Sequence, residues 1–578
     1  MSCARNTILS LSQSLYSDSF PQTSVPWHIR LCPAPVSLCR FPVFKLQATT
    51  TSPTLAPVVH KNDEMLEIVE STKKREYLLE KITEKLQKIT EASEKLKLID
   101  EIQRLGIGYH FEDVIDNILQ VQCSAFSTEE DLFTTALRFR LLRQAGFHVT
   151  PEAFMRFKDK SGNFKESIGG DTPGLLSLYE ASHIGVDGEK MLEDARQLTE
   201  FYLRQSLARL APRPRGEVGQ ALEVPRHHRM VRLEARRFIE EYGKQSGHDR
   251  DLLELAILDY NQVQAQHKTE LTEIVRWWKE LGLVDKLSFA RDRPLECFLW
   301  SVGLLPDPKY SNCRIELAKN IAILLVIDDI FDTYGKMDDL ILFTHAIRRW
   351  DLEAMETLPE YMKICYMALY NTTNETCYRV LKDTRRTVFP YFKSTWIDMI
   401  EGFMVEAKWF NGGIAPNLEE YIENGVSTAG AYMALVYLFF LIGEGVTDQN
   451  ASLLIRKPYP KLFSAAGRIL RLWDDLGTAK EEEERGDLAS SIHLFIKEKN
   501  LSTEEDARSR ILEEIFRLWK DLNGELISDN KVLPLSIIKV ALDMARSSQV
   551  VYKHEGDTYF SSVDNYVEAL FFTPLVSS

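Results

Sequence analysis

The amino-acid sequence predicts an all-α protein built from two helical domains. From Tyr77 onward, apolar residues recur at every third or fourth position with charged residues between them, as in Leu78, Ile82, Leu86 and Ile89. This spacing is that of an amphipathic helix. It continues nearly to the end of the chain, and no segment alternates apolar and polar residues convincingly enough to predict a strand. A chain of 578 residues, 44% of them hydrophobic, is long enough for two or more domains, each with its own core.

The first 58 residues differ from the rest and are typical of a targeting segment. They hold one acidic residue, Asp18, whereas serine and threonine are dense and a few basic residues are present. An organelle transit peptide has this composition. Because serine dominates and arginine is sparse, we expect a plastid (chloroplast) destination, with an unstructured cytosolic tail as the alternative.

The remainder divides into an N-terminal helical domain, residues 59–268, and a C-terminal domain, residues 269–578. We expect the boundary near Gln266–Leu271, before the amphipathic stretch around Trp277. The polar stretch Arg213–Gly219 predicts a break inside the first domain.

Charge and cysteine usage exclude several classes of protein. A net charge of −15 argues against nucleic acid or an anionic membrane as a partner. No apolar run reaches the roughly 18 residues of a membrane span. The eight cysteines are scattered without a CxxC pair, which indicates reduced thiols.

The first chemical motif is a group of aspartates at the end of an apolar run. Ile321–Ile327 is followed by Asp328, Asp329 and Asp332. Burying such a helix end is costly unless cations neutralise the carboxylates. On a helix, Asp328 and Asp332 share one face, with Asp329 about 100° round.

The second motif is Asp474-Asp475 with Thr478 and Glu482. Asp474, Thr478 and Glu482 are spaced by four residues and form one stripe on a helix. Oxygen ligands without a nearby His or Cys select hard cations such as Mg²⁺ or Mn²⁺. Either motif alone could be a solvated helix face, but the pair in this order predicts a metal-bridged diphosphate site.

With these motifs the chain resembles the plant terpene synthases of the metal-dependent, ionising class. Arg291-Asp292-Arg293 looks like the family's RxR motif, Arg471 stands where the family carries a diphosphate-binding arginine, and Trp300 matches a pocket tryptophan. Further stretches resemble the family's N-terminal domain: Leu98–Gly106, Tyr109–Phe111 and Asp171–Ala181.

The resemblance implies a C-terminal terpenoid-synthase α-bundle, an N-terminal α-barrel-like domain, and a monomer that acts on a small prenyl diphosphate. It implies three Mg²⁺ ions, with Mn²⁺ as a substitute, in a site whose metal ligands are Asp328, Asp329, Asp332, Asp474, Thr478 and Glu482.

The resemblance also implies roles in substrate binding and catalysis. The diphosphate would be bound by Arg291, Arg471 and the metal-bearing residues Asp328, Asp332 and Asp474. Trp300 would steady the allylic cation by cation–π contact, with plain helix packing as the alternative. Tyr559 lies in a stretch like the family's closing loop and would act in catalysis with Arg291, with a simple turn as the alternative.

Two departures from the family pattern bear on the product. The chain lacks the N-terminal RRx8W motif of many cyclising relatives, and Ser490 stands where many of them carry Lys. This resembles the subfamily that makes acyclic terpenes. We therefore expect ionisation of geranyl diphosphate, and of farnesyl diphosphate as a further substrate, followed by attack of water to give linalool or nerolidol. Myrcene, ocimene or a cyclic monoterpene are the alternatives.

Two readings from other classes compete. A prenyl-chain-elongating transferase also uses aspartate-rich helices, but it would carry a second DDxxD in place of Asp474…Glu482. A catalytically dead helical binding protein would not need both motifs intact. The N-terminal domain lacks a DxDD string, so it would scaffold or cap the catalytic domain.

Overall fold

The computed structural model describes residues 61–123, 129–485, 490–553 and 563–576, without the side chains of 61–69, 479–485 and 563–564. The segment 1–58 thus lies outside the described residues. The boundary between two compact units falls at Tyr77–Leu78, and the second unit runs on from Leu78. In the described ranges all regular secondary structure is helical, apart from one isolated β-bridge between Lys158 and Phe164. The all-α prediction is confirmed.

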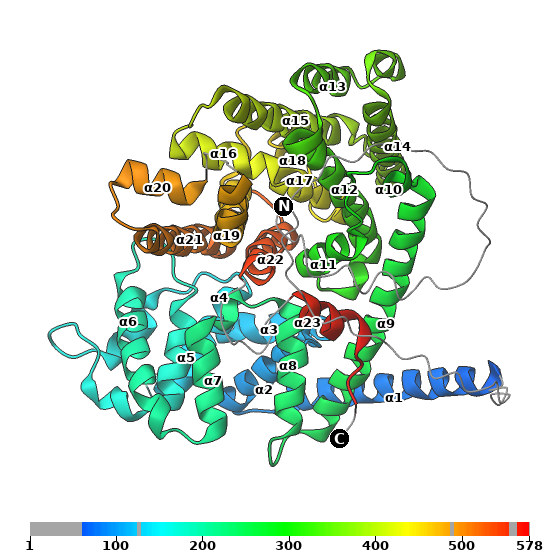
Figure 1. The fold of residues 1–578 in the computed structure, drawn as a ribbon. Coiled ribbons are helices and arrows are strands. Elements are labelled where there is room, and N and C mark those ends of the chain that lie inside the picture. The colour runs from blue at the N-terminus through cyan, green and yellow to red at the C-terminus, as the bar shows by residue number, and fades with distance from the viewer. Residues whose placement is uncertain (1–60, 124–128, 486–489, 554–562, 577–578) are drawn as a thin grey trace, which may run out of the picture. The chain divides into compact units, whose positions relative to one another are not determined.

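The helices from α2 to α8 form a packed group in which α4 contacts α2 and α5, and α5 contacts α6 (Figure 1). The first helix, α1 Lys61–Lys88, spans the boundary between the two units. The bounds of the others are α2 Ala92–Arg104, α3 Glu112–Gln122, α4 Leu132–Gln144, α5 Thr172–Ser182, α6 Lys190–Ser206, α7 Pro212–Glu223, η6 Arg226–His228 and α8 Val231–Gly243.

Helix α7 occupies the stretch that was predicted to be a break, so that prediction is wrong. Pro212 and Pro214 lie in the first turn, where a missing N–H and a fixed φ are tolerated. Gly216 and Gly219 have no neighbouring atom within 4 Å of the position a Cβ would take. The polar composition therefore marks an exposed helix.

Helix α9, Arg250–Leu281, runs through the position of the predicted domain boundary. The Asp249 side chain caps its start, and Gly282 ends it with a φ of +62°, a left-handed conformation that favours glycine. The division at residues 268/269 stays a prediction, and one helix belongs to both sides of it.

The helices that follow form the C-terminal bundle. Their bounds are α10 Leu283–Lys286, α11 Pro294–Leu304, α12 Ser311–Asp329, η8 Ile330–Tyr334, α13 Met337–Arg349, α14 Glu360–Thr384, α15 Phe389–Gly412, α16 Leu418–Thr428, α17 Ala431–Ile442, α18 Asp448–Ser452, α19 Lys461–Arg485, α20 Ser491–Lys499, α21 Glu504–Ile527, α22 Leu535–Tyr552, α23 Val563–Val567 and η10 Glu568–Phe572.

Two helices at the centre of this bundle carry the aspartate motifs. Helix α12 contacts α9, α11, α14 and α17, while α19 contacts α16, α21 and α22 (Figure 1). All but the first two residues of α12 are buried. A helix that is buried on every side belongs in a core, and the buried C-terminal end of α12 carries the first motif.

The segment after α22 returns to the N-terminal helices. Arg236 of α8 donates from Nη1 to the carbonyl oxygens of Ala569, at 2.9 Å, and Thr573, at 2.5 Å. Gln264 of α9 donates to the same two carbonyls at 3.2 and 3.1 Å. Leu575 is buried in the N-terminal core. These contacts hold η10 against α8 and α9.

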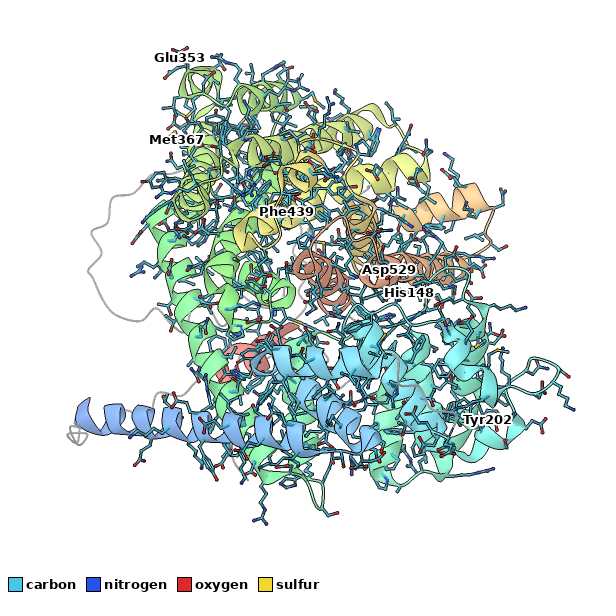
Figure 2. The ribbon with its side chains drawn as sticks, turned by 180° about the vertical axis from the view of Figure 1, so that it is seen from behind. His148, Tyr202, Glu353, Met367, Phe439 and Asp529 are labelled. Carbon is cyan, nitrogen blue, oxygen red and sulfur yellow. The ribbon has the colours of Figure 1, made fainter. Side chains whose placement is uncertain are left out.

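Side chains also join the two halves of the unit that begins at Leu78. Asn523 of α21 donates to the carbonyl oxygens of His183 and Gly185 at 3.1 and 2.9 Å. Nearby, Nδ1 of His148 lies 3.4 Å from Oδ2 of Asp529, and Figure 2 shows these two labelled residues side by side.

None of the described helices is by itself long and apolar enough to cross a membrane. The pair Leu418–Thr428 and Ala431–Ile442, bent by 43°, passes that test jointly, by length and composition alone.

Candidate active site

The first aspartate motif straddles the end of α12. Asp328 and Asp329 are buried in its last turn, and the backbone then widens into the π-helical turn η8. Asp332 lies on η8 and is exposed. The structure therefore differs from the single α-helical face expected for Asp328 and Asp332. π-helical turns within helices are frequent at functional sites because they redirect side chains.

Arg291 holds the two buried carboxylates of this motif. Its Nη2 donates to Asp328 Oδ2 at 2.8 Å and to the Leu325 carbonyl at 3.2 Å, and its Nε lies 2.8 Å from Asp329 Oδ1. Burial alone would lower the pKa of Arg291, but the two carboxylates outweigh it and raise the pKa above its ordinary value. The guanidinium stays charged and neutralises part of the motif.

A cavity opens beside this ion pair, and Trp300 lies in its wall. The lining residues come from the Arg291 loop, α11, α12 and α22: Arg291, Arg293, Glu296, Cys297, Trp300, Ile321, Leu325, Val551 and Tyr552. The ring of Trp300 packs near that of Tyr552, with centroids 5.9 Å apart. The cavity wall thus combines charged side chains, Arg291, Arg293 and Glu296, with apolar and aromatic ones.

The second aspartate motif lies in the middle of α19. Asp474, Asp475 and Thr478 are all buried. Nη1 of Arg471 lies 3.4 Å from Asp474 Oδ2, and Nη2 lies 2.5 Å from Asp475 Oδ1. Gly477 keeps the helix close to α22, because a Cβ there would stand 2.6 Å from the Tyr552 carbonyl oxygen. Tyr552 lines the cavity, so the second motif borders the same region as the first.

Glu406 of α15 links the two motifs electrostatically and was missed in the sequence. Its carboxylate accepts from Thr428 Oγ1 at 2.8 Å and from Asn424 Nδ2 at 3.0 Å. Burial raises the pKa of Glu406, Arg471 lowers it, and Asp328 raises it again. Glu406 therefore lies within electrostatic range of Arg471, beside the second motif, and of Asp328 in the first. No spacing relates it to either motif, so only the fold reveals it.

Other residues of the site also escaped the sequence prediction: Tyr421 contacts Arg471, and Tyr552 and Glu296 line the cavity. Asp475, which was named in the second motif without a role of its own, contacts Arg471 as well. Of the predicted residues, Glu482 belongs to α19 but its side chain is outside the described residues, and Tyr559 lies in the undescribed range 554–562.

The donor chemistry of the two motifs fits a hard divalent cation. The motifs offer carboxylates and a hydroxyl, and neither contains His or Cys. Among the described side chains, no three His, Cys, Asp or Glu converge as a metal-ligating group. Arg291 and Arg471 pair with several of these carboxylates and supply positive charge to the buried aspartates.

Comparison with known proteins agrees with this site. Two family models match the chain. The model described as "Terpene synthase family, metal binding domain" matches residues 279–521, and the one described as "Terpene synthase, N-terminal domain" matches residues 44–222. Geraniol synthase, chloroplastic, from Ocimum basilicum is 75% identical over 505 residues, which cover 87% of this chain and 88% of that protein. R-linalool synthase, chloroplastic, from the same species is 65% identical over 585 residues, which cover both chains fully.

A solved structure has the same fold. Isoprene synthase from grey poplar leaves (Populus x canescens), in complex with three Mg²⁺ ions and dimethylallyl-S-thiolodiphosphate, matches with a TM-score of 0.84. It is 37% identical, and the match covers 88% of this chain and 98% of that one.

Fold and site together define an all-α enzyme that depends on divalent metal ions. The chain belongs to the terpene synthase family, whose members act on small prenyl diphosphates as carbon–oxygen lyases. The plastid localisation predicted from the N-terminal segment is confirmed by the two chloroplastic relatives.

Proposed function

We propose that this terpene synthase ionises geranyl diphosphate and adds water to the resulting cation, giving an acyclic monoterpene alcohol with geraniol as the main product. The observation that carries the chemistry is the cavity beside Arg291, whose wall joins the ion pair of Arg291 and Asp328 to apolar and aromatic side chains. The choice of geraniol rests on the relative that is 75% identical.

The metal ligands we propose are the six residues predicted from the motifs: Asp328, Asp329, Asp332, Asp474, Thr478 and Glu482. Three Mg²⁺ ions are expected because the related isoprene synthase holds three, and Mn²⁺ is expected to substitute. Bound there, the ions would neutralise the charge that accumulates on the departing diphosphate.

The arginines of the site would bind the same diphosphate. Arg291 and Arg471 each hold a carboxylate pair and line or border the cavity. We propose that both guanidinium groups contact the diphosphate oxygens once substrate is bound. When the C1–O bond breaks, its electron pair leaves with the diphosphate, and fixed cations stabilise that developing charge most where water is excluded.

The apolar and aromatic part of the cavity wall would hold the allylic cation. Trp300 offers a π face for it, and Ile321, Leu325 and Val551 give it no nucleophile. Tyr559 is proposed to act in the segment that follows α22. Water that bonds to C1 yields geraniol after loss of a proton, and water that bonds to C3 yields linalool.

Linalool is the second candidate product. The R-linalool synthase relative aligns over the whole of both chains, and the missing RRx8W motif and Ser490 are compatible with either alcohol. Farnesyl diphosphate, if accepted, would give farnesol or nerolidol by the same two modes of attack.

One incubation tests the proposal. Purified protein lacking residues 1–58 is incubated with geranyl diphosphate and Mg²⁺ in ¹⁸O-labelled water, and the products are separated by chiral gas chromatography with mass detection. Carbon–oxygen cleavage places ¹⁸O in the alcohol, whereas phosphatase cleavage of the P–O bond leaves the substrate oxygen in place. Unlabelled geraniol, or a cyclic main product, would contradict the proposal. A parallel incubation with farnesyl diphosphate measures the substrate preference.

A further inference from the structure

The environment of Arg471 is asymmetric, and the asymmetry concerns its two aspartates. Nη2 lies 2.5 Å from Asp475 Oδ1, whereas Nη1 lies 3.4 Å from Asp474 Oδ2. Asp474 belongs to the stripe of proposed metal ligands, and Asp475 points to another side of the helix. The guanidinium is therefore held mainly by the aspartate that is not expected to bind metal.

Tyr421 of α16 completes this arrangement. Its hydroxyl accepts a hydrogen bond from Arg471 Nη2 and donates one to Asp475 Oδ1 at 3.0 Å. Arg471 also lies over the Tyr421 ring, 5.0 Å from its centroid. Tyr421 and Asp475 are both buried, so the triangle that they form with Arg471 is shielded from water.

Two further residues, Ser491 and Gly425, help to hold Asp475 and Arg471 in place. The second carboxylate oxygen of Asp475 accepts from the backbone N–H of Ser491, at the start of α20, at 3.3 Å. Gly425, one turn after Tyr421 on α16, leaves room for the arginine, because a Cβ there would stand 2.7 Å from Arg471 Cδ. Helices α16, α19 and α20 thus all constrain one side chain.

We propose that Tyr421 and Asp475 are positioning residues that aim Arg471 at the substrate diphosphate and keep it from collapsing onto the metal ligand Asp474. The inference rests on the diphosphate role of Arg471 in the proposed function. A guanidinium released from Tyr421 and Asp475 still has Asp474 Oδ2 3.4 Å from its Nη1, where it competes with the metal. Both effects weaken diphosphate binding.

Tyr421→Phe tests the proposal because it removes only the hydroxyl and keeps the ring beneath the guanidinium. The probe is inorganic diphosphate with Mg²⁺, and its dissociation constant is measured by calorimetry and by inhibition of turnover. Loss of a hydrogen bond to a charged group predicts an increase of about 10-fold. The Mg²⁺ concentration for half-maximal activity rises as well. Gly425→Ala, which crowds Arg471 while keeping every hydrogen-bonding group, is expected to act in the same direction.

Tyr432→Phe is the matched control. Tyr432 is an equally buried tyrosine whose hydroxyl donates to Glu423 at 3.1 Å, so the variant loses a comparable hydrogen bond without touching Arg471. Its diphosphate affinity should equal that of the unmodified enzyme. An equal loss in both variants would mean that the effect is general destabilisation, and would overturn the proposal.

A double-mutant cycle with Arg471→Lys separates this inference from the function on which it rests. If Tyr421 acts through Arg471, Tyr421→Phe changes diphosphate affinity little in the Arg471→Lys background, and additive losses overturn the inference. If Arg471→Lys weakens diphosphate binding but Tyr421→Phe does not, the inference alone fails. If Arg471→Lys leaves the affinity unchanged, the diphosphate role of Arg471 fails.

Discussion

Nη2 of Arg291 lies 2.8 Å from Oδ2 of Asp328, so a cation of the chain itself stands against the first aspartate motif. This pairing compensates the cost of burying a carboxylate at the end of an apolar helix. It also means that the fold does not need metal to tolerate the motif. A bound metal ion would then share the aspartates with an arginine that is already in place.

Removal of the metal should therefore abolish turnover without unfolding the protein. Treatment with a chelator is expected to stop product formation, and added Mg²⁺ should restore it. The far-ultraviolet circular dichroism should stay unchanged throughout, because Arg291 and Arg471 neutralise the aspartates in the metal-free state. A loss of helical signal on chelation would show that the metal is structural.

Asp328→Asn should lower turnover of geranyl diphosphate by about 10²–10³-fold, the usual cost of losing one group that stabilises transition-state charge. Arg291 keeps Asp329 as a partner, so the melting temperature should change little. Asp338→Asn is the control, because Asp338 is an exposed aspartate on α13. Near-normal turnover by Asp328→Asn at saturating Mg²⁺ would refute the proposed metal site.

Gly477→Ala should reduce both stability and turnover. Its Cβ would stand 2.6 Å from the backbone carbonyl oxygen of Tyr552, which cannot move without shifting α22. Overpacking of this kind costs about 1–3 kcal/mol. Gly524 lies in α21 with no atom within 4 Å of the Cβ position, so Gly524→Ala should gain about 0.5–1 kcal/mol. Urea unfolding of both variants measures the contrast, and equal effects would contradict it.

The helical fold could be predicted from the sequence because its signal is local. Apolar residues at every third or fourth position predict the helices, and the buried run Ile321–Ile327 predicts a core helix that ends in aspartates. The stretch Arg213–Gly219 misled because its proline lies in the first turn of α7, where it does not end a helix, and its two glycines are tolerated further along. The π-helical turn that begins at Ile330 was also not predictable, because no residue pattern distinguishes a π-helical turn from an α-helical one.

Only those residues of the site that belong to a sequence motif could be predicted. Arg471 stands one helical turn before its aspartates, and Arg291 belongs to a recognisable RxR string 37 residues before Asp328; the structure brings each arginine into contact with its aspartates. Glu406 and Tyr421 come from separate helices whose packing depends on the tertiary fold. No local pattern could reveal them.

Acid should weaken the contact between α5, η6 and α21. Burial, together with Arg196 and Arg546 respectively, lowers the pKa of His183 and of His227 to about 3. An unfolded histidine titrates near 6.5, so the unfolded chain binds more protons between about pH 6.5 and 3. The free energy of unfolding is therefore unaffected by these histidines above about pH 6.5. Below that it decreases by about 1.4 kcal/mol for each unit by which the pH falls and for each histidine.

His183→Phe should remove one of these contributions. Neither ring nitrogen of His183 has a hydrogen-bond partner in the part of the chain that the structure describes, so a phenyl ring loses no bond there. Urea midpoints measured between about pH 7.5 and 5.5 should fall less steeply for the variant than for the unmodified protein. Parallel curves would exclude His183 as a source of the acid sensitivity.

Removal of residues 1–58 should leave a soluble and active enzyme, because their composition is that of a transit peptide. The kcat/KM for geranyl diphosphate should match that of the longer chain. The same segment fused to a fluorescent protein should direct it to plastids, and a cytosolic signal would contradict the transit assignment.

The hydrogen bonds from Arg236 and Gln264 to Ala569 and Thr573 set an order for folding. These donors are synthesised more than 300 residues before the carbonyls that they bind. Until those carbonyls have been synthesised, the side chains of Arg236 and Gln264 stand without these two acceptors. The N-terminal helices can therefore reach their final packing only after residues 563–576 have left the ribosome, and a ribosome stalled shortly before that point would hold a nascent chain that is helical yet incompletely closed.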